Sequence, residues 1–264
     1  GSENATIASY DSLGDVIYDG DGLYSKLTLG NVYKNLTIDG IGSYILNNAL
    51  TVTEDMAINS GKLDINGENI TVDGKFSNNG IFQLEGTETV DLTFDYNSGT
   101  VVYDGVGSFE GLAYKDKYND LVFENNATFI LDENLKVYGN MTINSGKIDL
   151  NGNDLNVKGD FSNNATLKVQ GSEKIKLDQD VDSGTVEYYG AGDFTDLEYG
   201  NEYFDLTFDS QEGSWKADAN VDVHGNLRIL NGEFDISGYI LSVEGSLEGE
   251  IVNSALLTEV LGIG

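Results

Sequence analysis

The stretch "NSGKLDINGENITVDGKFSNNG" (59–80) recurs 85 residues later as "NSGKIDLNGNDLNVKGDFSNNA" (144–165). The same step continues beyond it, with one extra residue after position 213. Positions that keep the step are Tyr18, Tyr103 and Tyr188, and Val52, Val137 and Val223. A fixed internal period is the signature of repeat architectures. We therefore expect a single domain over residues 1–264, with copies at about 5–97, 98–182 and 183–260 and a divergent tail at about 249–264.

A finer period lies inside each copy. Units such as "LTVTEDMAINSGKLDINGEN" (50–69) and "ITVDGKFSNNGIFQLEGTET" (70–89) each open on an apolar-x-apolar pair. Apolar residues alternate with polar ones, which is typical of short half-buried strands. Gly, Asn and Asp stand between the strands, and these residues tolerate the left-handed backbone of a sharp corner. Three short strands and three corners describe one coil of a β-solenoid.

The sequence thus predicts an all-β fold, a parallel β-solenoid of about twelve coils of 20–24 residues arranged as three 85-residue repeats. One coil cannot bury its apolar face alone, so neighbouring coils must stack into a continuous core. At the spacing of paired strands, twelve coils make a rod about 55–60 Å long. In the opening stretch we expect the inward side chains to be Ile58, Leu63, Ile65, Ile70, Val72 and Phe76.

Charge and composition exclude several classes of protein. The chain has 14 basic and 45 acidic residues, a formal charge of −31, which disfavours binding to nucleic acid and to anionic membrane surfaces. It has no cysteine, so disulfides and thiolate metal sites are excluded. No apolar run approaches the roughly 20 residues of a membrane span, so we expect no membrane insertion.

Several phrases resemble repeats of secreted prokaryotic adhesin-like and cell-surface filament proteins. They are "YKNLTIDGIGSYILNNALTV" (33–52), "NMTINSGKIDLNGNDLNVKGDFSNNA" (140–165) and "SGTVVYDGVGSF" (98–109). The resemblance implies a right-handed parallel β-helix that serves as an extracellular stalk, filament or adhesin body. Secretion would make glycosylation possible at six Asn-x-Thr sequons. The sequons are at Asn4, Asn35, Asn69, Asn126, Asn140 and Asn164.

Catalytic chemistry finds little support in the residues. The one arginine, Arg228, stands where the other copies have Ala57 and Thr142, so we expect it to point outward into solvent. The one histidine, His224, is expected at an exposed corner. A single histidine without cysteine excludes most nucleophile–base pairs. We therefore expect no catalytic residues and no enzyme, and a polysaccharide-active β-helix enzyme is the least favoured alternative.

Calcium is the one ion that the corners could hold. The segments "DINGEN" (64–69) and "DLNGND" (149–154) alternate Asp and Asn oxygens before a Gly turn, a spacing that hard cations can use. The third copy reads "DISGYI" (235–240) and loses this pattern. Asp and Asn also serve as ordinary corner residues that cap the backbone. We favour that role, expect no required cofactor, no metal ligand that can be assigned, and leave structural Ca²⁺ open.

Glycan binding and ice binding both depend on rows of exposed side chains. Aromatic side chains could bind surface glycans, but Tyr44 and Phe129 occupy roughly equivalent places in the other copies, so packing on or between coils is favoured. The candidates are Tyr188, Tyr189, Tyr199, Tyr203 and Trp215. Ice binding needs aligned threonines on a flat face. Thr51 and Thr71 align, but the same slot then reads Asp91, Ala113, Lys136 and Asn156, so ice binding is excluded.

The phase of the repeat suggests a partner. The first unit (5–26) is of the same kind as 90–111, and the last regular unit (241–260) is of the kind that precedes it. Stacking the end of one molecule on the start of the next would continue the rhythm, as would a longer array from which this piece comes. A non-closing contact of this type gives a filament. The tail "ALLTEVLGIG" (255–264) could add a strand to a neighbour. We therefore expect a secreted structural rod that assembles head to tail, with a glycan-binding adhesin module as the alternative.

Overall fold

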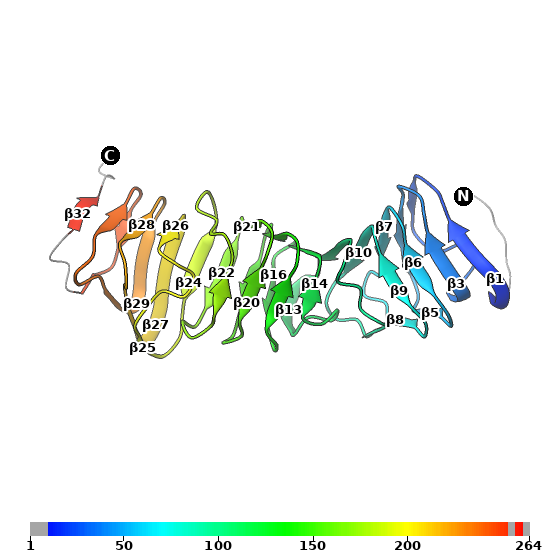
Figure 1. Cartoon of the computed structure of the whole chain (residues 1–264), viewed down its shortest axis with the longest axis horizontal. Coiled ribbons are helices and arrows are strands. Elements are labelled where there is room, and N and C mark those ends of the chain that lie inside the picture. Colours follow the sequence, from blue (N-terminus) through cyan, green and yellow to red (C-terminus); the bar gives the residue numbers. More distant parts are fainter. Residues whose placement is uncertain (1–9, 253–256, 261–264) are drawn as a thin grey trace.

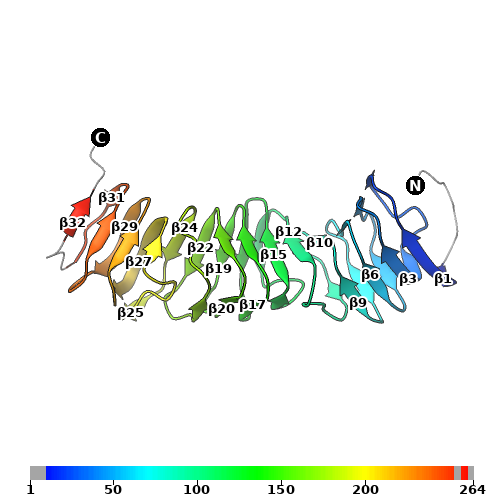
Figure 2. The same ribbon diagram turned by 45° about the horizontal axis from the view of Figure 1, so that its top comes forward.

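The computed structural model describes residues 10–252 and 257–260, and all of its regular secondary structure is β-strand. The strands are short, pair in parallel and wind into a long rod of about twelve turns (Figure 1). The view in Figure 2 shows the same stack of turns along the whole rod. The predicted all-β parallel solenoid is confirmed.

Three strands make one turn, and we call them first, second and third. The first strands are β5 (Leu50–Val52), β8 (Ile70–Val72), β11 (Val90–Asp91), β14 (Lys117–Tyr118), β17 (Leu135–Val137), β20 (Leu155–Val157), β23 (Ile175–Lys176), β26 (Glu202–Tyr203), β28 (Val221–Val223), β30 (Leu241–Val243) and β32 (Leu257–Val260). The second strands are β1 (Tyr10–Tyr18), β6 (Met56–Ile58), β9 (Phe76–Asn78), β12 (Thr100–Tyr103), β15 (Asp120–Phe123), β18 (Met141–Ile143), β21 (Phe161–Asn163), β24 (Thr185–Tyr188) and β31 (Leu247–Glu248). The third strands are β2 (Leu23–Tyr24), β4 (Ser43–Ile45), β7 (Lys62–Asp64), β10 (Ile81–Leu84), β13 (Gly107–Glu110), β16 (Ala127–Ile130), β19 (Lys147–Asp149), β22 (Thr166–Val169) and β25 (Gly192–Phe194). Four longer strands pass a corner and belong to two classes: β1, whose Tyr10 also pairs as a first strand, β3 (Val32–Ile38), β27 (Asp205–Lys216) and β29 (Leu227–Asp235).

At each junction between repeat copies, the strands of the new copy move to the next side of the coil. At the first junction β10, a third strand, pairs with β12, which is a second strand of the next copy. At the next junction β22 pairs with β24 in the same way. The segments 92–99 and 177–184 cover the side that is passed without a strand. Each copy therefore takes four turns and one further side.

This shift explains the unequal unit lengths in the sequence. Paired residues are 19 apart between Ile81 and Thr100, and 20 apart between Leu121 and Met141. A turn thus stays near 20 residues throughout. The units of 22 to 24 residues found in the sequence contain the extra side rather than wider turns.

One position assigned from the sequence was wrong. The outward slot that follows Asp91 was expected to be Ala113, because Leu112-x-Tyr114 has the apolar alternation of a first strand. In the structure Lys117 of β14, four residues further on, occupies this slot and pairs with Lys136. Tyr114 instead packs at the junction, where its hydroxyl donates to the backbone carbonyl of Asp95 at 2.9 Å.

Close stacking of the corners requires glycine at some positions. Gly61 has φ = +68°, and a Cβ there would stand 2.2 Å from the carbonyl oxygen of Gly40 in the preceding turn. Gly146 occupies the same place in the next copy, with φ = +82° and 2.3 Å to the carbonyl of Ala127. The "NSG" letters of the repeated stretch therefore mark a contact between successive backbones.

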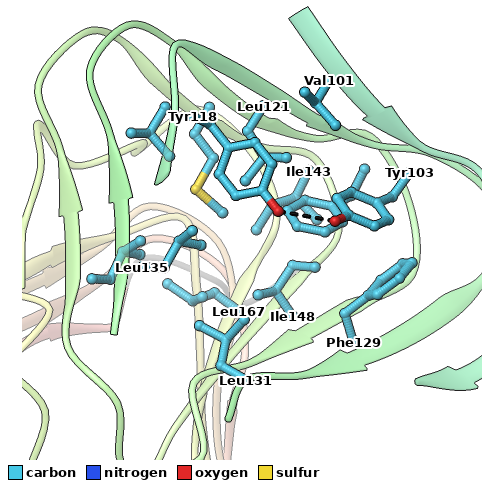
Figure 3. Close-up of a cluster of buried hydrophobic side chains, with 14 of the residues drawn as sticks. Val101, Tyr103, Tyr118, Leu121, Phe129, Leu131, Leu135, Ile143, Ile148 and Leu167 are labelled. Carbon is cyan, nitrogen blue, oxygen red and sulfur yellow. Dashed lines mark hydrogen bonds between the residues drawn. The ribbon is translucent and has the colours of Figure 1, made fainter. Parts of the chain in front are cut away.

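The interior is one continuous apolar cluster that runs from Val16 to Val243. All six side chains expected to point inward in the opening stretch are buried, so that prediction is confirmed. Figure 3 shows part of the cluster around Phe129, Ile143 and Ile148. Such a core stabilises the rod only while turns remain stacked, because each turn covers its neighbour's apolar side chains.

Each copy carries a hydrogen-bonded tyrosine pair in or against this core. The hydroxyls of Tyr103 and Tyr118 lie 2.9 Å apart, as the dashed line in Figure 3 shows. Tyr118 donates to the carbonyl of Lys115, and Tyr103 accepts from the backbone N–H of Tyr114. Tyr18–Tyr33 and Tyr188–Tyr203 repeat the pair at 2.9 and 3.2 Å. Burial raises the pKa of Tyr103 and of Tyr188, so these phenols stay neutral and serve as hydrogen-bonding core residues.

Part of the sequence prediction lies outside the described residues. This holds for the sequon at Asn4 and for most of the tail 255–264. Within the tail, β32 pairs in parallel with β30.

Candidate functional surfaces

Two buried carboxylates sit in loops of backbone N–H groups at the junctions. Glu173 is fully buried and accepts hydrogen bonds from the backbone of Gly152, Gln170, Gly171 and Ser172, at 2.7 to 3.1 Å. Its counterpart one copy earlier, Glu88, accepts from three such groups, at 2.6 to 3.1 Å. Every donor that a ligand could use is already occupied by the protein's own carboxylate, so these loops are structural.

Asp and Asn side chains form ladders along two corners. Along one corner the Asp120 carboxylate accepts from the backbone N–H of Asn140, and the Asn140 amide oxygen accepts from Asp160, at 2.7 and 2.9 Å. Along another corner the Asn134 amide oxygen accepts from the backbone N–H of Asp154, and the Asp154 carboxylate accepts from that of Lys174, at 2.8 Å each. Sequon residues Asn35, Asn69 and Asn140 belong to these ladders. Their amide oxygens therefore hold successive turns together.

The corners predicted to be open to calcium use their oxygens locally. Asp64 accepts from the backbone N–H of Asn66 at 3.0 Å, and Asp149 accepts from that of Asn151 at 2.9 Å. Asp235 makes the same turn with Ser237 in the third copy, which lacks the calcium-like pattern. The contact is thus common to all three copies, which favours the role of corner residue.

An acidic row runs from the third strands of the first copy, β7 and β10, to the residue after β12 across the first junction. The amide of Gln83 donates to Asp64 at 3.1 Å and to Asp104 at 2.6 Å, and so bridges two carboxyl groups. Asp104 Oδ1 is buried and makes no hydrogen bond within the described residues. Burial, with added repulsion between the two groups at Asp64, raises the pKa of both carboxyls. Lys62 lies 3.9 Å from Asp64 and offsets part of this cost.

The second copy replaces this row with paired charges. Lys168 lies 3.0 Å from Glu187 and 4.5 Å from the ring centre of Tyr189. The Tyr189 hydroxyl donates to Asp149 at 2.6 Å. Equivalent positions thus carry a carboxyl oxygen without a hydrogen bond in one copy and a satisfied network in the next. The surface chemistry therefore changes from copy to copy.

A lysine row lies on the first strands of the second copy. Lys117, Lys136, Asn156 and Lys176 occupy successive rungs of one sheet. The same position in the third copy holds Glu202, Asp222 and Ser242. In the first copy it holds Val32, Thr51, Thr71 and Asp91. Two threonines in line, followed by acids and lysines, do not form the flat threonine face that ice binding needs.

The aromatic residues considered for glycan binding mostly lie in the core. Tyr188, Tyr203 and Trp215 are fully inaccessible, and Tyr199 is buried. Tyr189 is partly accessible, but its ring and hydroxyl are held by Lys168 and Asp149. The four buried side chains therefore form no sugar-binding surface, and packing between turns, the interpretation favoured from the sequence, accounts for them.

The two residues considered for catalysis point outward and pair with the next turn. Arg228 Nε lies 3.9 Å from Glu248, and His224 Nδ1 lies 3.3 Å from Glu244. The residues are four positions apart and face different neighbours. The placement agrees with the expectation of an exposed arginine and an exposed corner histidine.

Sequence reasoning missed an exposed aromatic stack beside the lysine row. The rings of Tyr96 and Tyr138 stack with centres 5.6 Å apart. The ammonium groups of Lys136 and Lys158 lie 4.7 and 4.8 Å from the centre of the Tyr138 ring. The spacing of two residues between Lys136 and Tyr138, and of 20 between Tyr138 and Lys158, is a signal that the repeat register could have given.

Across residues 10–252 and 257–260, no three His, Cys, Asp or Glu side chains are grouped so that they could hold a metal ion. The same residues include no helix long and apolar enough to cross a membrane. The chain matches no protein-family model, and comparison with curated proteins and with solved structures likewise gives no match.

Proposed function

We propose that this chain is an extracellular structural protein, a β-solenoid rod that joins end to end with further solenoid turns to form a filament, sheath or adhesin stalk. The observation that carries the proposal is the stacking of parallel-paired turns over one continuous apolar core. In such a stack each turn is held by the backbone hydrogen bonds of the next, which resists shear and proteolysis. The resemblance to repeats of secreted prokaryotic surface proteins supports the extracellular setting.

The outer turns support end-to-end joining. Within the described residues β2 pairs only with β4, and β31 pairs only with β29, so each leaves one edge unpaired. Leu23 of β2 is 75% exposed and Ile17 of β1 is 59% exposed. Unpaired parallel edges beside apolar side chains favour the addition of another strand. The proposed partner is therefore a further copy of this chain.

Negative-stain electron microscopy of the purified chain, together with light scattering, tests the proposal. We expect rods whose lengths are multiples of the single rod and whose mean length rises with protein concentration. Leu23→Asp should shorten them, because it places a charge at the joining edge. Val106→Asp is the matched control, since Val106 is 76% exposed in the middle of the rod. Single rods at every concentration, or equal effects of the two changes, would refute end-to-end joining.

A further inference from the structure

The lysine row forms a basic strip on a protein of charge −31. We use the name lysine strip for the three lysines of this row, Lys117, Lys136 and Lys176. Lys136 and Lys176 form no ion pair within the described residues, and Lys117 meets only Asp116, at 3.8 Å. The nearby Asp154 carboxylate is turned to the backbone N–H of Lys174. Most of the positive charges of the strip therefore have no acidic partner within the described residues.

An acidic strip occupies the same position of the coil in the third copy. Glu202 and Asp222 are exposed, lie on adjacent rungs and form no ion pair within the described residues. Ser242 continues the row on the next rung. In both strips one side chain projects from each turn, and two charged rungs are followed by an uncharged one, Asn156 or Ser242. Lys117 and Lys136 therefore have the same spacing as Glu202 and Asp222, which is the rise of the solenoid, about 4.8 Å per turn.

We propose that the lysine strip docks on the acidic strip of a second copy of this chain, so that rods associate side by side. Charge complementarity at equal spacing is the ground for choosing this partner. A rod from the same sequence has the required rise by construction, since both strips belong to one solenoid. This inference rests on the proposed function of a structural rod and adds bundling to end-to-end joining.

The shift between copies makes this contact open-ended. Asp95 and Tyr114 are hydrogen-bonded to each other, so the turn leading to β14 stacks on segment 92–99, which itself covers β9. The first strands of a new copy thus lie on the side of the coil where the second strands of the preceding copy lie. The same holds for Asp180 and Tyr199 at the next junction. The two strips therefore face different sides of the rod, and two rods cannot satisfy both pairs of strips with one another.

A contact of this kind propagates from rod to rod instead of closing into a dimer. Exposed ion pairs contribute only about 0.2–1 kcal/mol each, so a single contact is weak. The overall negative charge also opposes approach at low ionic strength. At about 0.1 M salt the screening length is about 10 Å, which weakens long-range repulsion more than contacts between neighbouring charges. Bundling should therefore peak at intermediate salt and fall at about 1 M.

Sedimentation velocity at about 0.1 M salt, with charge-reversal variants, tests the inference. Variant one carries K117E, K136E and K176E, and variant two carries E202K and D222K. Each alone should lose side-by-side association, because all of its strips then have one sign. An equimolar mixture should regain it, since the reversed strips complement each other. Association that persists in both variants alone, or a mixture that fails to associate while the wild type does, would overturn the proposal.

Further controls separate the other outcomes. Circular dichroism checks folding, and Lys→Gln and Glu→Gln versions replace any variant that does not fold. A wild type that stays unbundled at all salt concentrations, yet binds polygalacturonate through the three lysines, would make the strip a site for acidic polysaccharide and overturn the proposal. Microscopy distinguishes rod width from rod length, so loss of bundling in variant one with unchanged lengths leaves end-to-end joining intact.

Discussion

At the scale of single residues, Lys115 adopts a backbone conformation that suits glycine. Its φ is +80°, and the equivalent residues Gly30 and Gly200 have φ of +111° and +120°. A left-handed backbone costs a residue with a Cβ about 1 kcal/mol or more. We therefore expect Lys115→Gly to raise the free energy of unfolding by about 1 kcal/mol, measured by urea denaturation. Lys117→Gly, in extended strand β14, is the control and should destabilise by about 0.5–1 kcal/mol. A destabilised Lys115→Gly would contradict the account.

The acid pair bridged by Gln83 gives a pH dependence. Burial raises the pKa of Asp104 and of Asp64, so the folded state holds protons that the unfolded chain releases. The stabilisation from protonation is full below the ordinary Asp pKa and is lost as pH rises through the raised values. The free energy of unfolding should therefore increase as pH falls from neutral toward the ordinary Asp pKa, by more than the general relief of charge repulsion provides.

Asp104→Asn isolates this effect, because the amide keeps an acceptor for Gln83 and removes the charge. The variant should be more stable than the wild type at pH 7, and the difference should shrink toward pH 4. Thermal melts across this range measure it. Glu124→Gln, at a neighbouring exposed position, is the control for the loss of one surface charge. Equal pH slopes for Asp104→Asn and the wild type would contradict the prediction.

At the scale of elements, the junction depends on the buried carboxylate of Glu173. Removing it leaves four backbone donors without a partner, and each unsatisfied buried group costs about 1–3 kcal/mol. We expect Glu173→Ala to lower the unfolding free energy by more than about 3 kcal/mol in chemical denaturation. Glu133→Ala, at an exposed corner, is the control and should change it by less than about 0.5 kcal/mol. Similar effects of the two would refute the junction's dependence on Glu173.

The elements also show where sequence reasoning succeeds and where it ends. Strands such as β6 and β8 were predictable because Ile58 and Ile70 alternate with polar neighbours and recur at a fixed step. The junction was not, since the alternation of Leu112 and Tyr114 resembles a strand although the turn continues to Lys117. Glu173 could not be recognised as buried either, because its partners are backbone groups, which no side-chain pattern reveals. Trp215 was ambiguous because an aromatic residue suits both the core and a sugar platform.

At the scale of the whole molecule, a turn is a unit that can be removed. Deleting residues 135–154 takes out one complete turn and joins Asn134 to Leu155, which then pairs as Leu135 did. We expect a folded, slightly shorter rod with native circular dichroism and a modestly lower melting temperature, since stability in stacked repeats is nearly a sum over neighbours. Deleting only 135–144 removes half a turn and should abolish cooperative unfolding. Failure of the full-turn deletion to fold while the half-turn deletion folds would contradict the stacking register.

Because each junction moves the strands to the next side of the coil, equivalent surface positions of successive copies wind around the rod. Three successive shifts, one per 85-residue copy, return a given position to its first direction after 255 residues. A flat partner lying along the rod therefore meets the same position of the copy once in three copies, whereas a partner that uses every copy must wind around the rod. The number of contacts that a longer array offers to a flat partner is thus set by its number of complete groups of three copies. Adding one or two copies leaves that number nearly unchanged.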